Sequence, residues 1–305
     1  MSITVYSTPA EDFFRAGVDE RREVLARMAG VGIDGVFYAD HVTFRNGAGM
    51  DGLILLAGLS QLHPTLGLQI GVYLLPLRHP VLVARQLSSL WELAPGRVSF
   101  GVGIGGEDRH EIEACEVDPR TRGRRCDESL AVLQRLLAGE TVTHHGTFFH
   151  LDEVLIRPTP VPPIPLYVGG RSDAAVRRTG TYGQGWIGSW CSPERFGTAT
   201  ELCRTVAEEA GRGEVDWHHE MQAWVGLGAD RDSARAAVSV AMERFYGVPF
   251  AAFERYVPYG TPQEVAEFFW PYVEAGAKQL NLTPCAQPGV DVVGLTGAVR
   301  AALVR

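Results

Sequence analysis

Short apolar segments alternate with longer amphipathic segments along almost the whole chain. The short segments predict strands near residues 2–6, 34–39, 66–74, 97–102, 164–168, 185–189, 221–227 and 279–283. The longer segments predict helices near residues 18–30, 50–62, 80–93, 122–138, 172–182, 193–211, 230–246 and 262–276. Strands that alternate with helices in this way form parallel sheets with right-handed crossovers, and a (β/α)8 TIM barrel is the economical closed form.

Three segments break the alternation and predict insertions in the barrel. Residues 104–120 form a charged stretch after the fourth strand. Residues 139–163 are rich in glycine, histidine and proline, which is typical of a hairpin followed by an extended connector. Residues 247–260 are aromatic and punctuated by glycine and proline, as loops that cover a barrel mouth often are. Thr261, followed by a proline and then by Glu264, predicts the start of the last barrel helix.

The size and composition of the chain favour one domain with small-molecule chemistry. A chain of 305 residues with 46% hydrophobic content can bury a large core, so we expect one domain over 1–305. The net charge of -8 would repel nucleic acids and anionic membranes. No apolar run reaches the roughly 20 residues of a membrane-spanning helix, and the first residues lack the basic start of a secretion signal. We therefore expect a cytoplasmic protein.

Cysteine and histidine positions give no sign of a metal site. Five widely spaced cysteines without a C-x-x-C pair suit reduced thiols better than disulfides or zinc. The pairs His144-His145 and His218-His219 lack companion ligands at metal spacing, so no metal is expected.

The second predicted strand ends in Asp40-His41, at the barrel end where active sites are built. His41 is the best candidate for proton transfer, because an imidazole titrates near neutrality and a neighbouring carboxylate can orient it. The alternative is a histidine that only lines the pocket or bonds a backbone carbonyl. Glu107, in the charged run that ends at Glu111, is a candidate second acid or base, although a solvated loop explains the same run.

A phosphate site is predicted after the fifth strand. Gly169, Gly170, Arg171 and Ser172 follow that strand directly and open a helix. Their amides and the serine hydroxyl can meet a phosphate at the positive end of the helix dipole, and the arginine adds a charged donor. A capping serine after a tight glycine turn is the simpler interpretation, and both can hold together.

Two further features also invite a ligand. Gly71, followed by Val72 inside an apolar strand, predicts a bulge or a close approach by a ligand, or else close packing of a helix. The arginines at 120, 122, 124 and 125 form a basic cluster that could receive an anionic group, although such clusters are usually solvated.

Taken jointly, these motifs resemble the bacterial luciferase-like family of flavin- and deazaflavin-dependent oxidoreductases. The matching stretches are Asp40-His41, Leu75–Pro80, Gly101–Gly103, Arg122–Glu128, Pro163–Gly170 and Gly185-Trp186. Within that family the chain is most similar to the branch that depends on coenzyme F420, a 5-deazaflavin that transfers hydride. It departs from the sugar-phosphate dehydrogenases at Gly106 and Arg45, where a glutamate and a tryptophan are expected.

The resemblance implies a TIM barrel, usually a homodimer, with the deazaflavin at the carboxyl-terminal mouth. It also implies a bulge with a non-proline cis peptide at Gly71-Val72 beneath the ring. The candidate catalytic residues are then His41, Asp40 and Glu107. The candidate cofactor-binding residues are Gly71, Val72, Gly103, Gly105, Gly169, Gly170, Arg171, Ser172, Gly185 and Trp186.

We therefore expect an F420-dependent oxidoreductase that transfers hydride between the deazaflavin and a small organic substrate, without nucleic-acid or membrane partners. Two alternatives remain open. One is an FMN-dependent monooxygenase supplied by a separate reductase, and the other is a flavin-binding protein without catalytic activity. Substrate specificity is expected in the loops 42–50, 104–120 and 247–260, where no motif names a substrate.

Overall fold

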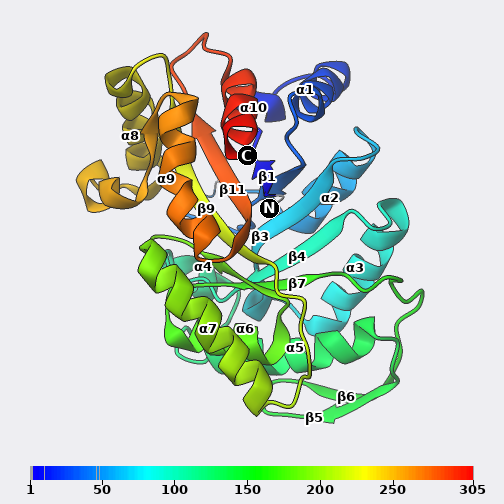
Figure 1. The fold of residues 1–305 in the computed structure, drawn as a ribbon. Coiled ribbons are helices and arrows are strands. Elements are labelled where there is room, and N and C mark those ends of the chain that lie inside the picture. Colours follow the sequence, from blue (N-terminus) through cyan, green and yellow to red (C-terminus); the bar gives the residue numbers. More distant parts are fainter. Residues whose placement is uncertain (1–2, 10, 46, 48, 305) are drawn as a thin grey trace.

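The computed structural model describes residues 3–9, 11–45, 47 and 49–304. Its centre is a closed barrel of parallel strands (Figure 1), in which the pairing of β8 with β9 completes the ring. The barrel strands are β1 (Thr4–Ser7), β2 (Gly35–Tyr38), β3 (Gly67–Leu74), β4 (Val98–Gly103), β7 (Leu166–Gly169), β8 (Gly185–Gly188), β9 (His219–Leu227) and β11 (Ala277–Cys285). The predicted (β/α)8 TIM barrel is confirmed.

Helices surround the barrel, and each predicted helix is present with small shifts at its ends. They are α1 (Val18–Gly30), α2 (Gly52–Ser60), α3 (Pro80–Leu93), α5 (Arg122–Leu137), α6 (Asp173–Tyr182), α7 (Pro193–Glu209), α8 (Arg231–Tyr246) and α9 (Pro262–Glu274). Short 3-10 turns occur at η1 (Glu11–Phe14), η2 (Leu75–Leu77), η3 (Phe250–Ala252) and η4 (Glu254–Tyr256). A short strand, β10 (Tyr259–Gly260), pairs with β9 outside the ring.

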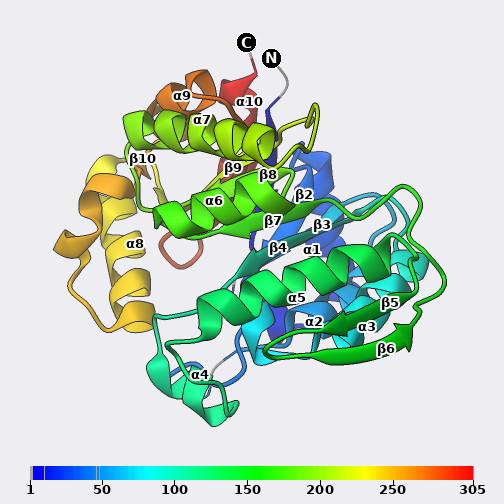
Figure 2. The ribbon, with the colours of Figure 1, turned by 90° about the horizontal axis from the view of Figure 1, so that it is seen from below.

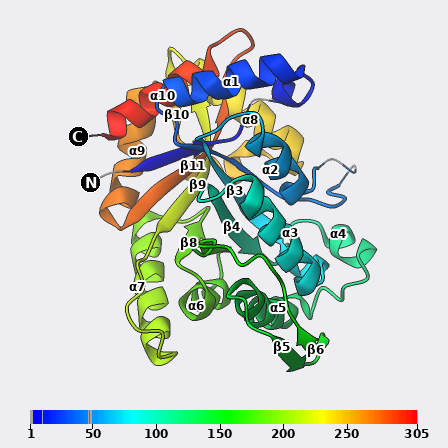
Figure 3. The same ribbon diagram turned by 90° about the vertical axis from the view of Figure 1, so that its right-hand side faces the viewer.

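The prediction that α9 is the last barrel helix was wrong. A further helix, α10 (Val292–Leu303), follows β11 and packs beside α1 and α9 (Figure 3). Its two glycines, Gly294 and Gly297, weaken the helical signal in the sequence. Packing accounts for the second glycine, because a β-carbon at Gly297 would lie 2.5 Å from the Val31 Cβ atom.

The three predicted insertions have different structures. Residues 104–120 contain the helix α4 (Arg109–Ala114), and residues 247–260 contain η3 and η4. Residues 139–163 contain an antiparallel hairpin of β5 (Val142–His145) and β6 (His150–Val154). Glu128 on α5 holds its turn, since its carboxylate accepts hydrogen bonds from the Phe148 and Phe149 amides. In Figure 2, α4 and α8 lie at the same end of the barrel.

The barrel interior near its amino-terminal end is polar. Glu220 has no exposed surface, and its two carboxyl oxygens lie 2.9 and 2.7 Å from the Gln69 Nε2 atom. The Asn281 amide donates a third hydrogen bond of 2.7 Å. Burial raises the pKa of Glu220 to about 8, although the amide hydrogen bonds act in the opposite direction.

This buried carboxyl group makes stability depend on pH. Between about pH 4 and the raised pKa, the unfolded chain releases a proton that folded Glu220 keeps, so the free energy of unfolding falls as pH rises. Glu220→Gln removes this linkage. We expect the Tm of the variant minus the Tm of the parent protein to increase as the pH rises from about 5 to 8, as measured by calorimetry. The exposed Glu92→Gln serves as control, and a constant Tm difference for Glu220→Gln would contradict the prediction.

Candidate active site

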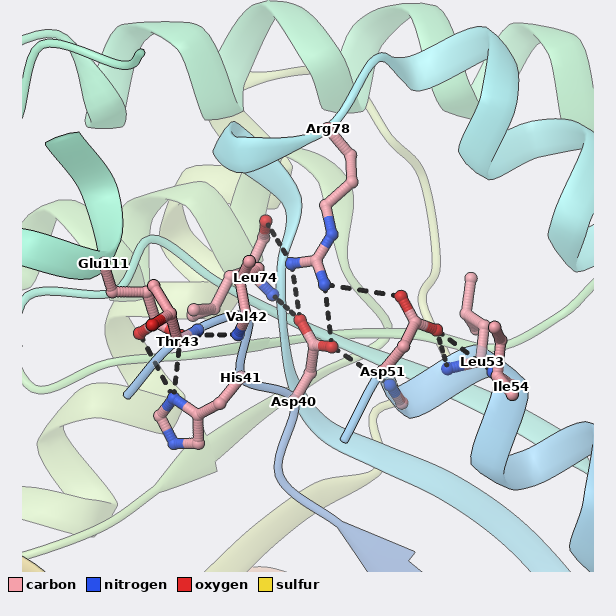
Figure 4. Close-up of polar contacts among 11 residues, drawn as sticks. Asp40, His41, Val42, Thr43, Asp51, Leu53, Ile54, Leu74, Arg78 and Glu111 are labelled. Carbon is pink, nitrogen blue, oxygen red and sulfur yellow. Dashed lines mark hydrogen bonds and ion pairs between the residues drawn. The ribbon is translucent and has the colours of Figure 1, made fainter. Parts of the chain in front are cut away.

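Asp40 and His41 follow the carboxyl end of β2 and point to different partners (Figure 4). Asp40 is buried, and its carboxylate accepts hydrogen bonds of 2.6 and 2.9 Å from the two terminal nitrogens of Arg78. The amides of Gly52 and Leu74 donate two more, of 3.0 and 3.1 Å. Burial raises the pKa of Asp40, and Arg78 and the amides oppose this effect. The carboxylate thus ties the end of β2 to α2 and to the end of β3.

His41 is held by Glu111. The imidazole Nδ1 atom lies 3.3 and 3.2 Å from the two carboxylate oxygens of Glu111. The same carboxylate accepts hydrogen bonds from the backbone amides of Val42 and Thr43, at 2.6 and 3.2 Å. Because an ionised carboxylate only accepts, Nδ1 carries a proton in this arrangement, and the Nε2 atom makes no contact with Glu111. In Figure 4 that second nitrogen points away from Glu111.

The sequence analysis predicted Glu107, and not Glu111, as the candidate acid or base of the charged run. The structure leaves Glu107 exposed and brings Glu111, which is 2% exposed, to His41. The start of α4 decides this difference: Asp108 caps the helix by accepting a hydrogen bond from the His110 amide, which places Glu111 in the first turn. The helical phase of the run, set by this cap, is the signal that could have identified Glu111.

The backbone of β3 carries the predicted bulge. Its register against β4 shifts between Ile70 and Tyr73, and the Gly71–Val72 peptide bond is cis. Both backbone features are therefore confirmed, while a role in cofactor binding stays a prediction. The bulge touches the end of β2, because the Asp40 amide donates a hydrogen bond of 3.3 Å to the Val72 carbonyl oxygen.

The Val72 side chain fills the space beside two glycines of neighbouring strands. A β-carbon on Gly103, at the end of β4, would overlap the Val72 Cγ2 atom. A β-carbon on Gly169, at the end of β7, would lie 2.6 Å from its Cγ1 atom. Packing does not require glycine at position 71, where the nearest contact of a β-carbon would be 3.5 Å, to the Gln222 Oε1 atom.

The predicted phosphate segment lies at the amino-terminal end of α6. Ser172 caps this helix, with its hydroxyl oxygen 3.3 Å from the Ala175 amide nitrogen. Arg171 and Ser172 are exposed, and Gly170 has a φ of 133° that few other residues adopt. The segment therefore offers a helix terminus, a hydroxyl group and a guanidinium group to solvent.

Gly185 and Trp186 lie in the wall of the barrel. Trp186 has no exposed surface, and its indole nitrogen donates a hydrogen bond of 2.8 Å to the Gly170 carbonyl oxygen. Gly185 leaves space for the His218 carbonyl group, which a β-carbon there would overlap. Trp186 could therefore affect a bound ligand only indirectly, by holding the Gly170 carbonyl group in position.

The loop after β4 lies against Arg122, the first residue of α5. Gly105 and Gly106 have φ values of 69° and 137°, and Gly106 approaches the Arg122 side chain. The buried Nε atom of Arg122 has no hydrogen-bond partner in the described part of the chain. Among the described residues, no three His, Cys, Asp or Glu side chains are grouped to hold a metal ion. No described helix has the length and apolar character needed to span a membrane.

Comparisons with known proteins identify relatives of this chain. Residues 4–279 match the family model described as luciferase-like monooxygenase. The F420-dependent glucose-6-phosphate dehydrogenase of Beutenbergia cavernae is 31% identical over 300 residues, which cover 84% of each chain. An uncharacterized protein of Mycobacterium tuberculosis is 33% identical over 159 residues, 52% of this chain and 54% of that protein. The chain thus spans about half the length of the first curated relatives it matches.

Solved structures share the fold. An F420-dependent secondary alcohol dehydrogenase in complex with an F420-acetone adduct has a TM-score of 0.83 at 20% identity, with all of both chains covered. The monooxygenase RslO1 from Streptomyces bottropensis has a TM-score of 0.78 at 22% identity, covering 99% of this chain and 97% of its own. At such identities the likeness concerns the fold alone. On the match over residues 4–279, the chain belongs to the luciferase-like monooxygenase family.

Proposed function

We propose that this protein is an oxidoreductase that uses coenzyme F420 to transfer hydride to or from a small organic substrate. The observation that carries the proposal is the His41–Glu111 pair at the barrel mouth, one residue from the contact between Asp40 and the Val72 carbonyl group. The relative from Beutenbergia cavernae, named for the same coenzyme and covered over 84% of its length, supports the choice of cofactor.

Three features near the carboxyl ends of the strands support a site for a planar ring that carries a phosphate-bearing chain. The bulge at Gly71 and Val72 presents backbone rather than a bulky side chain at position 71. Arg171, Ser172 and the α6 terminus can bind a phosphate. The Nε atom of Arg122, which has no partner among the residues that the structure describes, is a further donor for an anionic group.

Each candidate residue then has a distinct part in holding the cofactor. Gly71 and Val72 would lie beneath the ring, Gly105 would border it, and Gly170, Arg171 and Ser172 would hold the phosphate. Gly103 and Gly169 would act through Val72, and Gly185 and Trp186 would act through the wall beneath Gly170. When bound, the deazaflavin accepts or donates the hydride.

The protein residues handle the proton that accompanies the hydride. In the oxidative direction the Nε2 atom of His41 accepts the proton of the substrate hydroxyl group. Glu111 holds the ring in the required tautomer and stabilises the imidazolium that forms. Asp40 is a positioning residue, since its carboxylate is fully occupied by Arg78 and two amides. Glu107 remains a candidate second acid at the rim of the mouth.

Titration of the purified protein with coenzyme F420 and with FMN, followed by ring fluorescence, tests the cofactor. We expect tighter binding of coenzyme F420, and Arg171→Gln should raise its Kd about tenfold by removing a charged donor. Arg177→Gln, an exposed change further along α6, is the matched control. Tighter FMN binding would instead support the two-component monooxygenase, and binding without turnover would favour a non-catalytic protein.

We also propose that the protein is a cytoplasmic homodimer, served by a separate flavin or deazaflavin reductase. The α2 sequence is apolar on all sides, yet Ile54 on this helix is 70% exposed. Leu82 on the adjacent helix α3 is 63% exposed. A second copy that covers this face would bury both side chains, and light scattering of the purified protein would test this.

A further inference from the structure

We infer that the substrate is an uncharged alcohol or carbonyl compound with an apolar body, held next to His41 by an aromatic wall. This inference rests on the proposed function and specifies its substrate class. The aromatic wall consists of Phe44, Trp190, Trp224, Phe245, Tyr246 and Phe253.

The rings of the wall form a continuous series that begins at His41. The imidazole lies 4.3 Å from the Phe44 ring, centroid to centroid, and Phe44 stacks on Phe245 at 5.2 Å. The Trp224 ring is 5.6 Å from Phe245 and 6.0 Å from Tyr246. Because each ring contacts the next, a ligand that reaches the Nε2 atom of His41 meets aromatic surface beside it.

The far end of the wall continues the same series. Tyr246 lies 5.2 Å from Phe253, which in turn lies 4.6 Å from Trp190. The six residues come from segments far apart in the sequence: the loop after β2, the loop after β8, strand β9, the end of α8 and the turn between η3 and η4. Their convergence at one place indicates a built surface rather than a chance contact.

One side of the wall packs on a core and the other stays partly open. Behind it lies a separate cluster of buried residues, Val238, Met242, Phe250 and Val257. Phe44 is buried, whereas the other five wall residues are only partly buried. The wall is therefore not simply interior packing, and it lies at the carboxyl-terminal end of the barrel, where the loops after β2 and β8 supply Phe44 and Trp190.

Two polar groups of the wall are paired with each other. The Trp224 indole nitrogen donates a hydrogen bond of 3.1 Å to the Tyr246 hydroxyl oxygen. Glu107 and Arg171, which are the charged groups that act on Tyr246, have opposite signs. The Arg45 guanidinium lies 5.3 Å from the centre of the Phe44 ring. This cation would suit an anionic substrate, so the test below includes a sugar phosphate.

The reaction of such a substrate balances with the proposed cofactor. In the oxidative direction the carbinol C–H bond breaks, and its hydride would pass to the deazaflavin that the site would hold. The O–H bond breaks as well, and its proton passes to the Nε2 atom of His41 while the carbonyl double bond forms. An apolar body contributes binding through burial against the wall, so each added methylene should raise kcat/KM about threefold to fourfold.

Two measurements test the inference. The first compares kcat/KM for 2-propanol, 2-butanol, 2-hexanol, 2-octanol and glucose 6-phosphate with coenzyme F420 present. The second titrates the protein without cofactor with 2-octanone and with glucose 6-phosphate, following tryptophan emission, because Trp190 and Trp224 lie in the wall. Phe245→Asn and Phe245→Leu are tested beside the parent protein, and Phe148→Asn in the hairpin is the control.

We expect kcat/KM to rise along the alcohol series, and Phe245→Asn to flatten the rise while Phe245→Leu and Phe148→Asn keep most of it. A saturable emission change with 2-octanone alone would support the same conclusion. Efficient turnover of glucose 6-phosphate without turnover of the alcohols would overturn the inference and leave the proposed function intact. Failure to bind coenzyme F420 would refute the proposed function. The emission titration would still test the substrate class in that case. A response to glucose 6-phosphate alone, or no response to 2-octanone, would overturn the inference of an apolar substrate.

Discussion

His41→Ala is expected to lower kcat/KM by about 10²- to 10⁴-fold, the range for loss of a general base. The Kd for coenzyme F420 should stay near the parent value, because the imidazole is assigned to the substrate proton and not to the phosphate or the ring. Steady-state reduction of the deazaflavin measures the first quantity, and fluorescence titration measures the second.

Two further results distinguish proton transfer from a structural effect. Added imidazole should restore part of the activity of His41→Ala, since a free base can enter the space left by the ring. Glu111→Gln should lower kcat more than it raises KM, because the amide cannot stabilise the imidazolium as a carboxylate does. Unchanged turnover in His41→Ala would remove His41 from the mechanism.

Arg78→Met is expected to destabilise the protein by about 3–5 kcal/mol, because it leaves the Asp40 carboxylate buried without its charged partner. The Tm should fall by roughly 5–8 °C, because a chain of 305 residues has an unfolding entropy of about 640 cal/mol/K. Calorimetry or thermal unfolding followed by circular dichroism measures the change. Asp40 is 1% exposed, so solvent cannot replace the lost contacts of 2.6 and 2.9 Å.

Arg22→Met provides the matched control. Arg22 forms an exposed ion pair of 3.0 Å with Asp19, and such pairs contribute less than about 1 kcal/mol. The double variant Asp40→Asn with Arg78→Met should recover part of the lost stability, because no charge is then left buried. Equal losses of unfolding free energy for Arg22→Met and Arg78→Met would show that the buried ion pair stabilises the protein no more than the exposed one.

The barrel could be predicted from the sequence because alternating apolar and amphipathic segments leave few topologies. The details of the site could not, and Asp40-His41 shows why. The two residues are neighbours in the sequence, but their side chains contact different partners, and the Asp40 carboxylate turns toward Arg78 (Figure 4). The partner of His41 is Glu111, 70 residues away along the chain.

The aromatic wall could not be predicted from the sequence either. The segment 247–260 was recognised as aromatic, but Phe253 is the wall residue that it supplies. The remaining rings come from two loops, a strand and the last turn of a helix, and the local sequence of each resembles ordinary core. Their meeting depends on closure of the ring between β8 and β9, which periodicity does not describe.

The contact of Val72 with Gly103 and Gly169 links three neighbouring strands by volume. The valine methyl groups occupy the space that side chains at the two glycines would need. A larger residue at either glycine therefore becomes admissible only together with a smaller one at position 72. Redesign of this barrel for a different ring must therefore change positions 72, 103 and 169 together. A larger side chain at one position alone would displace the bulge in β3, and with it the end of β2, which is hydrogen-bonded to the bulge.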